Sequence, residues 1–102
     1  MLNSKFSVAN ATLGNSDRYT AESQVLSIML ETDTAILDLR SERYFTLNDV
    51  GTRVWELLQE GTEVAVIVEL LVEEYDAPIE VIAADTRDIL IALLRRRLVR
   101  RV

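Results

Sequence analysis

Two carboxylates that stand three positions apart, Asp85 and Asp88, have the types and spacing that could do chemistry. Their segment has helical periodicity, and side chains three positions apart lie on the same face of a helix. Such a pair can hold a metal ion or divide into an acid and a base, but both kinds of site need further groups. The sequence offers no His and no third ligand for them. The pair therefore makes a poor metal or acid–base site and is equally well explained as two solvated helix residues.

The absence of His and Cys limits the chemistry of the whole chain. It removes thiolate nucleophiles, His-based acid–base catalysis, Ser-His-Asp sites, Cys and His zinc sites, and disulfide bonds. Ser, Thr and carboxylates remain, but no glycine-rich loop, no metal cluster and no base for a nucleophile accompany them. We therefore predict a protein that is not an enzyme and that needs no metal or cofactor.

Length and charge narrow the range of partners. The 102 residues are 49% hydrophobic and 27% charged, which suits one globular domain with a thin core. The net charge is −6, with 15 acidic and four basic residues between positions 31 and 90, so the body should repel nucleic acid. Five arginines follow from position 95 onward. They could aid solubility, favour the end of a helix dipole, or contact an anionic partner.

No segment of the sequence predicts export or insertion into a membrane. Residues 1–10 lack an apolar run long enough for a signal peptide, and no stretch approaches a transmembrane span. We expect a cytoplasmic protein without a membrane partner, and the missing cysteines are compatible with that location.

The elements that must position the two aspartates begin with three short apolar runs. Residues 1–23 show no sustained period and predict a loose N-terminal arm, with a short strand near residues 6–8, whereas residues 24–102 predict one folded domain. Apolar runs at 24–30, 35–39 and 44–47, separated by polar loops, predict an antiparallel meander. Alternation in the third run places Phe45 and Leu47 in the core, and leaves Tyr44 as a filler of the sheet surface or a ligand contact.

Two helices are expected next. Asn48 is a good N-cap for the first helix, Trp55 stands at the border of its apolar stripe, and Gly61 should end it. Thr62 is predicted to cap the second helix, which extends to about Tyr75. Its glutamates are expected to form the solvent-exposed face of the helix or, as the less favoured alternative, a docking surface for a basic enzyme.

A third helix is predicted from Pro78 to about Arg96, and residues 98–99 are expected to add a short strand, a small wing. A broad apolar arc of this helix should face the core. Beside that arc lies a flank of small, apolar and acidic side chains: Val81, Asp85, Asp88 and Ala92. Three strands followed by three helices predict an α+β fold.

Several short motifs follow one another between residues 24 and 100. They are Asp38, Tyr44-Phe45, Leu47-Asn48, Gly51, Trp55-Glu56-Leu57-Leu58, Gly61, Tyr75, Asp85, Ile89-Leu90, Leu93 and Leu98-Val99. Their combined order resembles the PqqD-like proteins, or RiPP recognition elements, the leader-binding domains of ribosomal peptide pathways. Within that family the chain looks most like the stand-alone B1 proteins of lasso-peptide clusters. It departs from the family in a 23-residue arm and in Arg97, where a glycine is usual.

The resemblance implies a winged helix-turn-helix that binds a leader peptide without catalysis. The leader would add an antiparallel strand to the third strand, pack against the third helix, and be delivered to a B2-type leader peptidase and a cyclase. Small Ala92 would leave room for an aromatic side chain of the leader, and Asp85 and Asp88 could pair with its Lys or Arg. The residues expected to bind the peptide are Arg43, Tyr44, Phe45, Thr46, Leu47, Val81, Asp85, Asp88, Ile89 and Ala92.

Other functions compete with this prediction. A PqqD proper, serving a radical enzyme in quinone-cofactor synthesis, would share the mechanism and differ in its partner. A winged-helix transcription regulator would need a basic recognition helix. The third helix before Arg95 instead carries three carboxylates and a single basic residue, Arg87. The open strand edge also allows either a monomer or a dimer formed by edge pairing or domain swapping.

Overall fold

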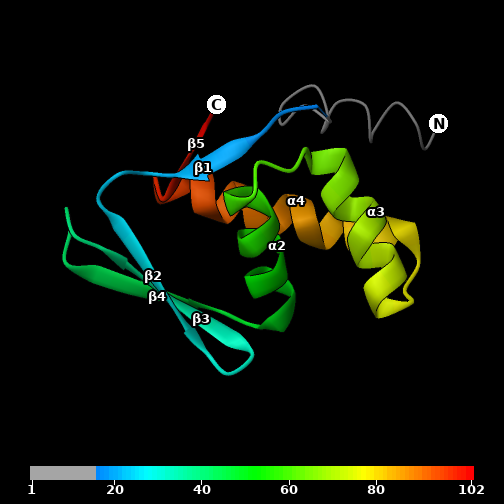
Figure 1. Ribbon diagram of the computed structural model, residues 1–102, viewed down its shortest axis with the longest axis horizontal. Coiled ribbons are helices and arrows are strands. Elements are labelled where there is room, and N and C mark those ends of the chain that lie inside the picture. The colour runs from blue at the N-terminus through cyan, green and yellow to red at the C-terminus, as the bar shows by residue number, and fades with distance from the viewer. Residues whose placement is uncertain (1–15) are drawn as a thin grey trace.

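The computed structural model describes residues 16–102, which form an α+β domain (Figure 1). A three-stranded antiparallel sheet has the order β2-β3-β4, and three helices follow it, so the predicted sheet and helices are confirmed. A separate pair of short strands, β1 and β5, joins the two ends of the described chain. The elements are β1 (Tyr19–Ala21), β2 (Val25–Leu30), β3 (Asp33–Asp38), β4 (Arg43–Leu47), α2 (Asp49–Gln59), α3 (Val64–Tyr75), α4 (Ile79–Arg95) and β5 (Val99–Arg101).

The register of the main sheet gives it one buried and one open face. Ile36 lies between Ser27 of β2 and Phe45 of β4, and its side chain is completely buried. Because successive residues of a strand point to opposite faces, the neighbours of Ile36 point away from the core. The resulting outer face carries large exposed apolar side chains, namely Leu26, Ile28, Leu30, Leu37 and Tyr44.

Helix α2 begins directly where β4 ends. The Asn48 side chain accepts a hydrogen bond of 2.9 Å from the Gly51 amide, so the predicted N-cap is confirmed. Gly51 also allows the strand end to pack closely on the helix, because a Cβ added there would lie 3.1 Å from the Leu47 Cβ. Gly61 ends α2 with a φ of +82°, as predicted.

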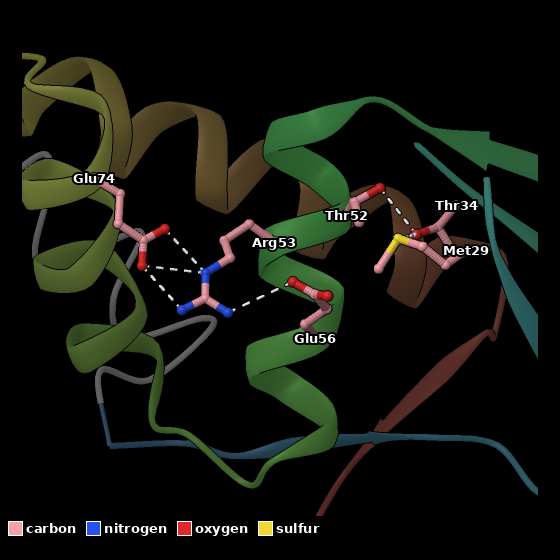
Figure 2. A network of polar contacts seen from close by, with 6 residues as sticks. All are labelled: Met29, Thr34, Thr52, Arg53, Glu56 and Glu74. Atoms are coloured by element: carbon pink, nitrogen blue, oxygen red, sulfur yellow. Dashed lines mark hydrogen bonds and ion pairs between the residues drawn. The ribbon is translucent and has the colours of Figure 1, made fainter. Parts of the chain in front are cut away.

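Polar contacts fix α2 on both of its sides (Figure 2). Toward the sheet, the buried Thr34 hydroxyl of β3 donates to the Thr52 hydroxyl over 2.9 Å. Toward α3, the Arg53 guanidinium binds both oxygens of the Glu74 carboxylate, at 2.9 Å for the shortest contacts. It also approaches Glu56, one turn along α2, at 3.5 Å. Since β4 leads straight into α2, these contacts also hold the end of β4.

The structure corrects three details of the predicted elements. Helix α3 has Glu63 as its N-cap, without a side-chain capping bond, so the assignment of Thr62 is wrong. Trp55 is only 4% exposed and belongs to the core instead of its border. Phe45 and Leu47 are half-buried, and they pack against the core from the sheet.

The predicted loose arm over residues 1–23 is wrong for Tyr19–Ala21, which form β1. This strand pairs antiparallel with β5, and the Tyr19 side chain is buried in the core. The short strand expected at residues 98–99 is therefore β5, which begins at Val99 and pairs with the first strand of the described residues. The strand predicted near residues 6–8 lies outside the described residues.

Candidate functional site

A groove of about 540 Å³ runs between strand β4 and helix α4. Its β4 side is the free edge of the main sheet, because β4 pairs only with β3 among residues 16–102. An unpaired strand edge presents a row of backbone donors and acceptors. The lining residues are Ile36, Tyr44, Phe45, Thr46, Leu47, Asp88, Ile89, Ala92, Leu93, Arg96 and Leu98.

A second, smaller hollow of about 280 Å³ continues the groove past the end of β4. It shares Asp88 and Ile89 with the first, which shows that the two hollows adjoin. Its other lining residues are Asn48 and Val50, at the start of α2, and Asp85 of α4. The combined groove therefore follows α4 for about three turns, from Asp85 to Arg96.

The floor of the groove is apolar and continuous with the core. Leu93 and Leu98 are buried, while Phe45, Leu47 and Ile89 are half-buried and pack against the core cluster. Ala92 leaves a low point between Ile89 and Leu93, because its side chain is a single methyl group. Apolar side chains of a bound chain could be buried along this floor at about 25 cal/mol per Å².

Charged side chains stand at the two ends of this floor. Asp88 has a side chain that is 72% exposed, and its contact with Arg87 is long, at 3.9 Å. Asp85 is exposed and has no ion-pair partner in the described part of the chain. At the other end, the Arg96 guanidinium lies over the Phe45 ring, 5.1 Å from its centroid. A cation over an aromatic face is held by a favourable electrostatic interaction, so Arg96 has a defined place in the groove.

Asp38 and Arg40 connect the turn before β4 to the end of α4. The buried Asp38 carboxylate accepts hydrogen bonds from the Arg40 side chain at 2.8 Å, the Arg40 amide at 3.0 Å and the Ser41 hydroxyl at 3.2 Å. The bond from the Arg40 guanidinium is the main reason why the pKa of Asp38 is lowered. Arg40 also donates to the carbonyl oxygen of Arg97. This link sets the distance between β4 and α4 at one end of the groove.

The turn that receives this link has the geometry of a glycine-terminated helix although it contains no glycine. Arg97 has a φ of +54°, and its amide bonds to the carbonyl of Leu94 over 3.0 Å. The Leu98 amide bonds to the carbonyl of Leu93, also over 3.0 Å. These two bonds define a Schellman motif, whose left-handed position usually holds glycine. The departure at Arg97 therefore leaves the shape of the turn unchanged.

The structure brings together most of the residues predicted to bind a peptide. Seven of them line the groove, and Asp85 lines its extension; the seven are Tyr44, Phe45, Thr46, Leu47, Asp88, Ile89 and Ala92. Arg43 is exposed at the start of β4, outside the lining. Val81, which is 50% exposed, lies one turn beyond the groove on α4.

Sequence reasoning missed Arg96 as a lining residue, although a signal for it exists. Arg96 stands four positions after Ala92 and eight after Asp88, a spacing that continues the same side of the helix. The sequence alone groups it with the arginines of the C-terminal tail. Asn48, Val50, Leu93, Leu98 and Ile36 complete the lining, and no local pattern distinguishes them from capping or core residues.

Two further properties concern the described residues as a set. None of the helices within residues 16–102 is long and apolar enough to cross a membrane. No group of three or more His, Cys, Asp or Glu residues in that range is arranged to hold a metal ion.

Comparisons with known proteins give a family and two similar structures. The family model described as coenzyme PQQ synthesis protein D (PqqD) matches residues 33–99. TbiB1 in complex with the TbiA(beta) leader peptide is 32% identical, with a TM-score of 0.74 over 78% of this chain and 93% of TbiB1. A lasso peptide synthetase B1 complexed with the leader peptide shares the fold, with 19% identity and a TM-score of 0.76 over 81% and 98% of the two chains. No curated protein sequence matches.

Proposed function

Because this chain belongs to the PqqD family, we propose that it is a RiPP recognition element that binds the leader region of a ribosomally made precursor. A lasso-peptide precursor is the proposed ligand, since the similar chain TbiB1, at 32% identity, is described in complex with a leader peptide. The observation that carries the proposal is the free edge of β4 beside an apolar groove. A peptide that adds a strand to this edge would fill the groove with its side chains.

Strand addition explains how a small domain can bind a flexible peptide. The backbone groups of Arg43–Leu47 would supply hydrogen bonds that each contribute about 0.5–1.5 kcal/mol, and the groove would supply specificity. The leader's aromatic or aliphatic side chains would pack on Phe45, Leu47 and Ile89, with room above Ala92. In this proposal α2, α3 and α4 form the helical part of a winged helix-turn-helix.

The proposed role is recognition and delivery without catalysis. The chain would hold the leader while a B2-type peptidase cleaves it and a cyclase closes the product. The outer face of the main sheet, with Ile28 and Leu37 exposed, is the surface that we assign to the peptidase. It adjoins the groove at Tyr44, so a peptidase seated there could contact the bound leader as well.

The test is a titration of the full chain with the labelled leader of the precursor that is encoded beside it. We expect a dissociation constant in the micromolar range or tighter, measured by fluorescence anisotropy. Asp88→Arg should weaken binding about threefold or more, and Ala92→Trp about tenfold or more, without unfolding the domain, because both alter the groove. If both variants bind the leader as the wild type does, the groove is not the site.

Matched controls separate the groove from the rest of the surface. Glu73→Arg and Val66→Trp repeat the two substitutions on exposed positions of α3, and they should leave leader binding unchanged. Ile28→Asp, on the opposite edge strand of the sheet, should also leave leader binding unchanged while it lowers capture of the peptidase.

A PqqD proper is the second candidate, because the matching family model carries that description. It would use the same groove for a precursor of quinone-cofactor synthesis. Competition between the lasso leader and the leader of that precursor would distinguish the two, since the native ligand should displace the other. Binding to duplex DNA, with no binding to either leader, would contradict both candidates.

A further inference from the structure

The groove between β4 and α4 has one acidic and one basic end. Asp85 and Asp88 line it where α4 passes the end of β4, beside Asn48 and Val50. Arg96 lines it eight residues further along α4, over the ring of Phe45. Arg43 begins β4 at the same basic end. The nearby Asp38 does not neutralise this end, because its carboxylate is already bound to Arg40.

The arginines at the basic end differ from most others in this domain. Six arginines have a carboxylate within ion-pair distance: Arg18, Arg40, Arg53, Arg87, Arg100 and Arg101. Within residues 16–102, Arg43, Arg95, Arg96 and Arg97 have none; Arg43 begins β4, the other three lie at the end of α4, and Arg96 is the one that lines the groove. A cation that lines a groove without a carboxylate partner favours an anionic group on the molecule that occupies the groove.

The distance between the two charged ends matches a short piece of extended peptide. Along α4, the eight residues from Asp88 to Arg96 span about 12 Å at 1.5 Å per residue. Along β4, the four steps from Arg43 to Leu47 span about 13 Å at about 3.3 Å per residue. A peptide strand that follows β4 therefore passes from one charged end to the other in about four residues.

We propose that the peptide bound here carries a Lys or Arg opposite Asp85 and Asp88, and an Asp or Glu about four positions away, opposite Arg96. This inference rests on the proposed strand addition. In an antiparallel strand the amino-terminal part lies beside Leu47, so the basic residue comes first in the peptide and the acidic residue follows. Side chains of an extended strand that are four positions apart face the same way, so both can point into the groove.

This charge pattern would fix the direction and the register of the ligand. A peptide bound in the opposite direction would place its acid beside Asp88 and its base beside Arg96. A slip of two residues would keep its apolar side chains on the groove face but move both charges off their partners. Because both protein charges are partly exposed, each pair should change the affinity by about threefold, and the two together by about tenfold.

The experiment is a selection from a random 12-residue peptide library displayed against the immobilised full chain. Sequenced peptides should be enriched in a base followed after about four positions by an acid. Asp88→Arg with Arg96→Glu should enrich the opposite order, and a synthetic peptide with its two charges exchanged should bind this double variant about tenfold more tightly than it binds the wild type. Glu73→Arg with Arg100→Glu, two exposed positions outside the groove lining and outside its basic end, should keep the wild-type pattern.

The outcomes separate this inference from the proposed function. Selected peptides with no charge order, or with an order unchanged by the double variant in the groove, overturn the charge pattern but leave peptide recognition standing. If no peptide is enriched and the encoded leader does not bind, strand addition fails and the charge pattern fails with it.

Discussion

Arg97 ends helix α4 in a left-handed backbone conformation that glycine adopts at lower cost. In this conformation a residue with a Cβ lowers the stability of the folded protein by roughly 1–2 kcal/mol. Part of that cost is offset, because such a residue has less conformational entropy than glycine in the unfolded chain. We therefore expect Arg97→Gly to raise the free energy of unfolding by about 0.5–1 kcal/mol. The carbonyl that accepts the bond from Arg40 belongs to the backbone, so the substitution keeps it. Urea denaturation monitored by circular dichroism would measure the change.

The matched control for this prediction lies two residues earlier. Arg95 is the last residue of α4 and is exposed, so Arg95→Gly should lower stability by about 0.5–1 kcal/mol. Both variants remove one arginine, which cancels the effect of net charge. Equal destabilisation by the two would show that Arg97 carries no backbone strain.

At the scale of elements, the bond between Asp38 and Arg40 holds the turn before β4, and its strength should depend on pH. The pKa of Asp38 is lowered chiefly by the hydrogen bond from Arg40. A carboxyl group whose pKa is lowered by folding stabilises the protein above its unfolded pKa of about 3.9, and that stabilisation is lost as the pH falls through its folded pKa. Asp38→Asn should therefore be less stable than the wild type at pH 7, and the difference should shrink below about pH 4.

Urea midpoints of the two proteins, measured in steps from pH 7 to pH 2.5, would check this prediction. Asp33→Asn is a suitable control, because Asp33 is an exposed residue of the same strand and the substitution removes the same charge. A constant difference between Asp38→Asn and the wild type over the whole range would mean that the charge of Asp38 is unimportant. Leader binding should weaken alongside stability, since Arg40 also reaches the Arg97 carbonyl at the end of the groove.

The elements that sequence alone could predict are those whose pattern is local. Helical periodicity predicts the bounds of α2 and α4 to within a few residues, and the cap at Asn48 marks the start of α2. Apolar alternation predicts β4, the strand that forms one wall of the groove. Strand β1 could not be predicted, because three residues carry no periodic signal and their partner lies about 80 positions later. Val81 fell outside the groove because the groove ends near Asn48, where β4 gives way to α2, and a helical wheel does not show where the facing strand stops.

At the scale of the whole molecule, two tyrosines lie in opposite environments. Tyr19, in β1, is 3% exposed and joins the core where β1 pairs with β5. Tyr44, in β4, is 71% exposed and lines the groove. Removal of a buried aromatic ring costs about 3–5 kcal/mol, whereas exposed substitutions usually change stability by about 0.5 kcal/mol or less. The two positions should therefore respond in opposite ways to the same substitution.

We expect Tyr19→Ala to lower the free energy of unfolding by about 3 kcal/mol, and the fraction that remains folded to bind the leader with unchanged affinity. Tyr44→Ala should keep the stability of the wild type and weaken leader binding about tenfold, because aromatic residues in a groove often carry much of the binding energy. Tyr19→Phe keeps the ring, and its free energy of unfolding should lie within about 1 kcal/mol of that of the wild type. It can therefore replace Tyr19→Ala in the binding measurement if Tyr19→Ala does not fold. Thermal unfolding and anisotropy titration of each variant would provide both readouts. Unchanged affinity in Tyr44→Ala would remove Tyr44 from the site and leave Phe45, Leu47 and the α4 side chains to bind the peptide.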